Sequence, residues 1–205
     1  MNVESILRAL NSAANTSVVF NSIMHMLVLS AILVVFLSPN LKLKRYCFDA
    51  LILILATSVA VISIMAGNPF HLITFGAFAI ISLIELIQGK NQVARPGSNF
   101  NTVISLIFIF IGFWYPEFVK ADPLSLLIVS PVGTIPCPTL LTCLGALNLS
   151  IPHVNRVQYI AALVLGIFYG LVGVFFLKVY LDIALIALVL YSLYNLKFIF
   201  VKKAI

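Results

Sequence analysis

Residues 131–143 read PVGTIPCPTLLTC, and strongly apolar sequence lies on both sides of them. Three prolines and a glycine fall within eight residues of this stretch. A proline removes a backbone donor and disfavours helical geometry in the residue before it, so the pattern predicts an interrupted helix at 130–138. We expect a short outer piece over 124–129 and an inner helix over about 138–148.

The whole chain is far more apolar than a water-soluble protein. It has 205 residues, of which 62% are hydrophobic and 9% charged, and its mean hydropathy is +1.17. Soluble domains carry about 25% charged residues, so this composition predicts a polytopic membrane protein. A net charge of +6 would suggest nucleic acid as a partner of a soluble protein. Here the basic residues lie in short loops, so we expect the lipid bilayer as partner and no nucleic acid.

Apolar runs of about 20 residues predict membrane-spanning helices. No alternation with a period of two suggests strands, so we expect an all-α bundle that forms a single domain over 1–205. Before the first run, 1–14 places its apolar residues on one helical face. It is either an amphipathic helix on the outer membrane surface or a frayed tail. About seven spans are predicted, at 17–38, 46–66, 69–88, 100–115, 124–150, 157–177 and 183–201.

Lysine and arginine are divided unevenly between the two sides that seven spans define. Because cytoplasmic loops carry the excess, we expect the N-terminus outside and the C-terminus in the cytoplasm. If 124–150 turned back without crossing, the division would become even, so we expect this fifth segment to cross. The cytoplasmic set is Lys42, Lys44, Arg45, Lys90, Arg95, Arg156, Lys197, Lys202 and Lys203, and the outer set is Arg8, Lys120 and Lys178.

Backbone that is not helical inside a bilayer must be buried in protein or line a wet cavity. Interrupted helices in transporters hold substrate in this way, with the helix N-terminus presenting partial positive charge. The alternative is a proline kink that only shapes packing, with threonine hydroxyls satisfying the freed backbone groups. The candidate site residues within the stretch are Thr134, Pro136, Cys137, Pro138 and Thr139.

Further polar residues fall inside predicted spans. Asn21 and His25 are four residues apart and therefore share one helical face, either as a structural hydrogen-bonding pair or as part of the same site. Tyr169 lies within GIFYGLVG, where small residues at spacing i, i+4 favour close helix packing, and its hydroxyl is a candidate partner for the interrupted backbone.

Two acidic residues, Asp49 and Glu85, fall near the predicted cytoplasmic ends of the second and third spans. We expect a structural role for both, with Lys44, Arg45 and Lys90 within reach as possible partners.

Known catalytic patterns do not occur in the sequence: it has no GxxxxGK[ST], HExxH or GxSxG. The cysteines Cys47, Cys137 and Cys143 have no zinc-ligand spacing. Cys137 and Cys143 are too far apart along a helix to form a disulfide. We therefore expect no catalytic residues, no metal and no cofactor.

The stretch GTIPCPT, followed about 30 residues later by GIFYGLVGVFFLKVYLD, resembles an uncharacterised family of bacterial integral membrane proteins, a domain of unknown function. That family carries a G-V-T-P-C-P-T-like motif and a later glycine-rich helix followed by an acidic residue, here Asp182. The pair Tyr115-Pro116 is also similar. This chain departs from the pattern at Gly133-Thr134-Ile135, where the hydroxyl is one residue further from Pro136. The resemblance implies a bacterial inner-membrane protein and no known activity.

Three functions are compatible with these observations. A small transporter or permease with its site at the broken fifth helix explains the interruption. A structural or accessory subunit of a larger membrane complex, or of a homo-oligomer, explains the small size and the glycine stripe. A membrane thiol redox or metal-handling protein explains Cys137, although no second cysteine in a matching repeat is present to pair with it.

Overall fold

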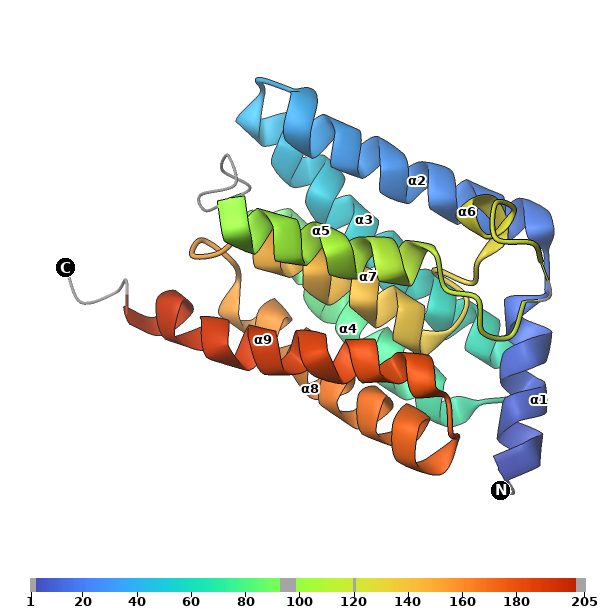
Figure 1. Cartoon of the computed structure of the whole chain (residues 1–205). Coiled ribbons are helices and arrows are strands. Elements are labelled where there is room, and N and C mark those ends of the chain that lie inside the picture. Colours follow the sequence, from blue (N-terminus) through green and yellow to red (C-terminus); the bar gives the residue numbers. More distant parts are fainter. Residues whose placement is uncertain (1–2, 93–98, 120, 202–205) are drawn as a thin grey trace.

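The computed structural model describes residues 3–92, 99–119 and 121–201, and the regular elements within these ranges are all helical (Figure 1). Of the basic residues counted above, Arg95, Lys120, Lys202 and Lys203 lie outside the described residues. The elements are α1 (Val3–Ala14), α2 (Val18–Leu37), α3 (Leu41–Met65), α4 (Pro69–Gln88), α5 (Asn99–Phe113), α6 (Leu126–Val129), α7 (Pro136–Leu149), α8 (Arg156–Leu171), the π-helical turn η1 (Val172–Phe176), the 3-10 turn η2 (Tyr180–Asp182) and α9 (Ile183–Val201).

Five helical stretches in the described part of the chain are long and apolar enough to cross a membrane: α2, α3, α4, α8 with η1, and η2 with α9. This agrees with the all-α membrane fold predicted from the sequence. The remaining two predicted segments contain shorter apolar helices, α5 with 15 residues and α7 with 14. At 1.5 Å per residue these helices are roughly 21–22 Å long, less than the ~30 Å hydrocarbon core.

Helix boundaries follow the capping residues more closely than the hydropathy. The predicted segments 69–88 and 183–201 coincide with α4 and α9. By contrast, α3 begins five residues before the predicted position 46, because the Asn40 side chain accepts hydrogen bonds from the N–H groups of Lys42 (3.0 Å) and Leu43 (3.1 Å). An asparagine cap of this kind starts a helix even where the first turn is charged.

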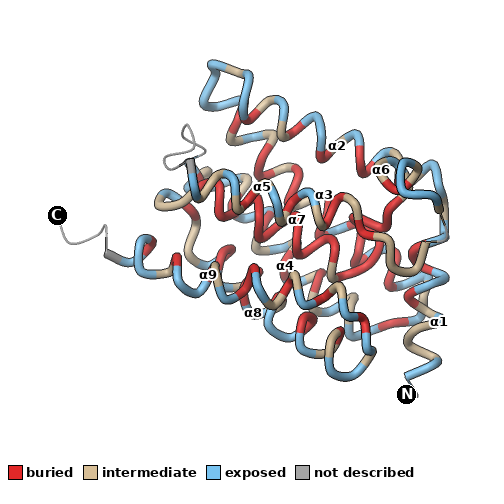
Figure 2. Tube along the Cα trace, in the orientation of Figure 1, coloured by how far each residue is buried: buried red, intermediate tan, exposed pale blue. Residues whose placement is uncertain are grey.

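The helix α7 forms the centre of the bundle and packs against α3, α5, α8 and α9. Figure 2 shows buried residues gathered along it, whereas the outward sides of the surrounding helices are exposed. Those exposed sides carry many large apolar side chains, as expected of a surface that faces lipid. Within α7 every residue is buried except Cys137, which is half-buried.

Where the sequence predicts the interruption, α6 ends at Val129 and α7 begins at Pro136. The second helix therefore starts two residues earlier than the expected position 138. The physical reason is that the first helical turn does not use its N–H groups, so it accommodates both Pro136 and Pro138.

The ends of the bundle differ in character. The amphipathic segment predicted at 1–14 is the helix α1, which lies across one end of the bundle (Figure 1). We call this the α1 end. The opposite end, here the basic end, carries Lys42, Lys44, Arg45, Lys90 and Arg156 near the starts of α3 and α8 and the end of α4.

The carboxylates of Asp49 and Glu85 lie near the basic end, and within the described part of the chain their hydrogen-bond partners are amides, with no ion pair to Lys44, Arg45 or Lys90. Both residues are fully buried, and their oxygens accept hydrogen bonds from Asn91 and Asn155. The Asn91 side chain donates to Asp49 Oδ1 at 2.7 Å, and its backbone N–H donates to Glu85 Oε1 at 2.6 Å. The Asn155 side chain also donates to Glu85. We call Asp49, Glu85, Asn91, Asn155 and Gln158 the amide–carboxylate cluster.

Candidate functional site

Side chains of α2 hold the interruption between α6 and α7. The Asn21 amide donates to Val129 O and to Ala14 O, both at 2.9 Å. One turn along the same helix, His25 Nε2 lies 3.0 Å from Ser130 O. The last carbonyls of a helix have no helical donor, so these bonds satisfy groups that would otherwise be buried without a partner. Asn21 and His25 therefore support the backbone here.

Hydroxyl groups complete the hydrogen bonding of the interrupted segment. The Gly133 N–H donates to Thr139 Oγ1 at 2.8 Å, and Ser58 Oγ donates to Gly133 O at 2.6 Å. Thr134 Oγ1 donates to Pro131 O at 2.8 Å. Gly133 has a left-handed φ of +79°, which lets the chain turn here without the steric cost of a side chain. The threonines thus act on the backbone, as the packing alternative requires.

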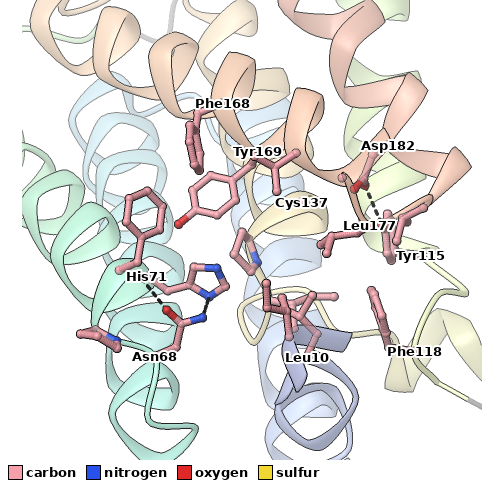
Figure 3. A pocket seen from close by; sticks show the side chains of 18 residues that line it. Leu10, Asn68, His71, Tyr115, Phe118, Cys137, Phe168, Tyr169, Leu177 and Asp182 are labelled. Carbon is pink, nitrogen blue, oxygen red and sulfur yellow. Dashed lines mark hydrogen bonds between the residues drawn. The ribbon is translucent and has the colours of Figure 1, made fainter. Parts of the chain in front are cut away.

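A cavity of about 270 Å³ lies beside this segment, at the α1 end of the bundle (Figure 3). Its walls come from α1, the starts of α4 and α7, the end of α8 with η1, and the segments that follow α5 and η1. Most of the wall is apolar or aromatic. The polar residues that line it are Asn68, His71, Tyr115, Cys137, Tyr169 and Asp182.

One corner of the cavity contains a buried carboxylate. The Tyr115 hydroxyl donates to Asp182 Oδ1 at 2.6 Å, and Cys137 lines the same cavity. Asp182 is 1% exposed and Tyr115 is fully buried. Gly173 in η1 makes room for the group: a Cβ at this position would overlap Asp182 Oδ2 and lie 2.7 Å from Asp182 Cγ. Three distant segments of the chain therefore meet at one carboxylate.

Aromatic rings form the opposite wall of the cavity. The rings of Phe70 and Phe168 lie 5.0 Å apart, those of Phe168 and Tyr169 5.3 Å apart, and those of His71 and Tyr169 5.3 Å apart. The hydroxyls of Tyr169 and Thr74 lie 2.8 Å apart. Tyr169 thus joins α8 to α4, and this hydroxyl does not reach the interrupted backbone as the sequence suggested.

The backbone is unusual at two positions around the cavity. Phe118, which lines it, has a φ of +68°, and Lys178, between the lining residues Leu177 and Val179, has a φ of +61°. Residues other than glycine rarely adopt this left-handed conformation, and such positions cluster at functional sites. The π-helical turn η1 also borders the cavity, and such turns are frequent at functional sites.

The N-terminus of α7 borders the cavity, but its electrostatic character differs from that of an ordinary helix start. The residues of its first turn are Pro136, Cys137 and Pro138. Because proline has no N–H, only Cys137 presents a free amide where three would normally face outward. The partial positive charge of a helix N-terminus resides on these amides, so it is weak here.

The residues predicted from the sequence therefore separate into two groups. Pro136, Cys137 and Tyr169 line the cavity. The others belong to the buried support around the interruption: Asn21, His25, Thr134, Pro138 and Thr139.

Four polar lining residues were not among the predicted site residues. Asp182 and Tyr115 entered the sequence analysis only through the proposed family resemblance. Asn68 and His71 lie at the start of α4, where the Asn68 side chain accepts from the His71 N–H at 3.2 Å. Their place on the cavity depends on how α4 packs, which local sequence does not reveal.

Among the described residues, no group of three or more histidine, cysteine, aspartate or glutamate side chains is arranged to hold a metal ion. Comparison of the chain with models of protein families, with curated proteins and with solved structures gives no match.

Proposed function

We propose that this protein is a small membrane transporter or permease that binds its substrate in the cavity at the α1 end. The observation that carries the proposal is the position of the cavity, beside an interrupted central helix and with a buried carboxylate at one corner. Non-helical backbone at membrane depth is tolerated only where it is buried in protein or lines a water-filled cavity. A hollow beside such backbone therefore suits a binding site inside the protein.

A seven-span topology is part of this proposal, with the N-terminus outside and the C-terminus in the cytoplasm. Together α6 and α7 provide 18 helical residues, or roughly 27 Å of helix, which approaches the hydrocarbon thickness once 130–135 is added. The basic end would face the cytoplasm by the positive-inside rule. The cavity would then lie near the outer surface, with α1 across it. The family resemblance suggests the bacterial inner membrane as its location.

The proposal is tested by the access of water-soluble reagents to Cys137. We would use protein that retains only this cysteine, through Cys47→Ala and Cys143→Ala, in oriented membrane vesicles. Two small methanethiosulfonates that do not cross membranes serve as probes, one with a trimethylammonium group and one with a sulfonate. We expect at least one of them to modify Cys137 from the outer side.

The matched control retains only Cys143, which is fully buried in α7. We expect it to react only after the protein is unfolded in detergent. If Cys137 were as inert as Cys143 in the folded protein and reactive only after unfolding, the cavity would be closed to solutes and the proposal would be wrong.

A further inference from the structure

We infer that the cavity binds a small organic cation with an apolar body, such as an aromatic or alkyl ammonium compound. This inference rests on the proposed function and names the substrate class of the same site. It follows from the charge of the lining residues, from the weak partial positive charge at the N-terminus of α7 and from the aromatic side chains in the cavity walls.

The lining has a negative charge with no basic residue to balance it. Asp182 accepts a hydrogen bond from Tyr115, and an ionised carboxylate has further lone pairs available. None of the described residues that line the cavity is a lysine or arginine. Glu117 lies close enough to Asp182 to add to the negative potential. A buried carboxylate without a cation is costly, so a positively charged ligand would relieve an existing imbalance.

His71 does not supply the missing positive charge. Its backbone N–H donates to Asn68 Oδ1 (3.2 Å), which fixes the orientation of the Asn68 amide. The Asn68 Nδ2 group, which can only donate, therefore faces His71 Nδ1 at 3.2 Å. Because Nδ1 accepts this bond, it carries no proton, and the imidazole is neutral in this arrangement.

An anionic substrate is disfavoured by the first turn of α7. Anion sites at helix N-termini depend on several free N–H groups and their partial positive charge. Because Pro136 and Pro138 have no N–H, two of the three N–H groups of the first turn are missing. The Asp182 carboxylate also lines the cavity that this turn borders. The prolines that interrupt the helix thus also remove its capacity to hold an anion.

The aromatic walls fit the apolar and cationic parts of such a ligand. Phe70, Phe118, Phe168, Tyr115 and Tyr169 all line the cavity. Aromatic faces attract ammonium groups through their quadrupole, and several faces around one site form the kind of cage that recognises quaternary ammonium. The volume of about 270 Å³ is less than twice that of a ~150 Å³ cavity that holds benzene, so the ligand has room for one ring and a small charged head.

The test compares the two methanethiosulfonates at Cys137 and adds competitors. Each rate is normalised to the rate for the same variant unfolded in detergent. We expect the trimethylammonium reagent to react about tenfold faster than the sulfonate, an effect typical of one nearby charge and aromatic contacts. Benzyltrimethylammonium should protect Cys137, whereas its neutral isostere neopentylbenzene at the same concentration should protect it much less.

Variants assign this selectivity to one carboxylate. In Asp182→Asn the two normalised rates should become equal within about threefold, because the charge is lost while the side chain keeps an acceptor for Tyr115. The matched control is Asp122→Asn. Asp122 is an exposed carboxyl at the same end, hydrogen bonds from Ser125 lower its pKa, and it does not line the cavity. This variant should keep the selectivity of the parent protein.

The outcomes separate the inference from the proposed function. If neither reagent reached Cys137, the proposed function would fail and the inference with it. If both reacted at equal normalised rates, or if the neutral isostere protected as well as the cation, the cavity would be accessible but the cationic substrate class would be wrong. Protection is measured on protein with Asp182 intact, so the test stands even if Asp182→Asn does not fold.

Discussion

The two ends of the bundle both bury carboxylates for which the described residues provide no lysine or arginine ion pair, but they do so in different ways. At the basic end, one residue of the amide–carboxylate cluster, Asn91, bonds to several others. Its side-chain NH₂ group donates to Asp49 Oδ1 and Gln158 Oε1, and its side-chain oxygen accepts from the Asn155 N–H. At the α1 end, the Asp182 carboxylate accepts a hydrogen bond from Tyr115 and faces a cavity.

This difference indicates that the basic end contributes more to the stability of the fold than the α1 end does. A buried polar network in which amides meet the carboxylates fixes the packing of the helices that carry it, because each member constrains the others. Here it joins α3, α4 and the start of α8. The Asp182 carboxylate faces a cavity and therefore contributes little to the packing of the helices. Around this cavity the backbone is left-handed at Phe118 and Lys178. We therefore expect substitutions at the basic end to reduce stability most.

The largest effect is expected for Asn91→Ala. The change removes the partners of Asp49 Oδ1 and Gln158 Oε1, which are buried, and of the half-buried Asn155 N–H. Each buried group left without a partner costs ~1–3 kcal/mol, so we expect a loss of about 3–5 kcal/mol in the free energy of unfolding. Unfolding of the purified protein in mixed detergent micelles measures it.

The control for this variant is Gln92→Ala, at the adjacent position, where the side chain is exposed. It should change the free energy of unfolding by less than about 0.5 kcal/mol. Equal losses in the two variants would show that the amide–carboxylate cluster contributes no special stability, and the contrast between the two ends would then disappear.

An intermediate effect is expected at the α1 end for Gly173→Ala. The new methyl group would overlap the Asp182 carboxylate, which must move away from Tyr115 or force η1 outward. Overpacking of this kind costs ~1–3 kcal/mol. We also expect faster reaction of Cys137 with thiol reagents, since a carboxylate that lines the same cavity is displaced. Thermal unfolding and labelling rates measure the two effects.

Gly76→Ala provides the comparison, because nothing lies within 4 Å of a Cβ at this position of α4. There the alanine should be neutral or stabilise the helix by up to ~1 kcal/mol. If Gly173→Ala behaved like Gly76→Ala in both measurements, Gly173 would not be needed for the position of the carboxylate.

Much of the fold is readable from the sequence because it depends on local features. The apolar runs predicted at about 69–88 and 183–201 fall on α4 and α9, and the proline cluster falls between α6 and the start of α7 at Pro136. The start of α3 was misjudged because hydropathy gave too little weight to the Asn40 cap.

The site was harder to predict because it is built from contacts between distant segments. Tyr115 and Asp182 are 67 residues apart and are joined by one hydrogen bond. Asp49 and Asn91 are 42 residues apart. No local pattern reveals such pairs. Spacing along a helix indicated that Asn21 and His25 share a face, but which neighbour that face meets depends on the packing of α2 against α6.

The smallest effect is expected within the interrupted segment, from a matched pair of threonines. Both Thr139 and Thr142 donate to the carbonyl four residues earlier, at 2.7 and 3.0 Å. Only Thr139 also accepts a bond from the Gly133 N–H. Thr139→Val leaves this amide without a partner inside the bundle, so we expect a loss of about 1–2 kcal/mol, whereas Thr142→Val should cost about 0–0.5 kcal/mol. The difference between the two unfolding free energies isolates one hydrogen bond of the interruption. If that difference were zero, the segment would reach its conformation without the Thr139 hydroxyl, and the prolines alone would account for the break that places Cys137 on the cavity.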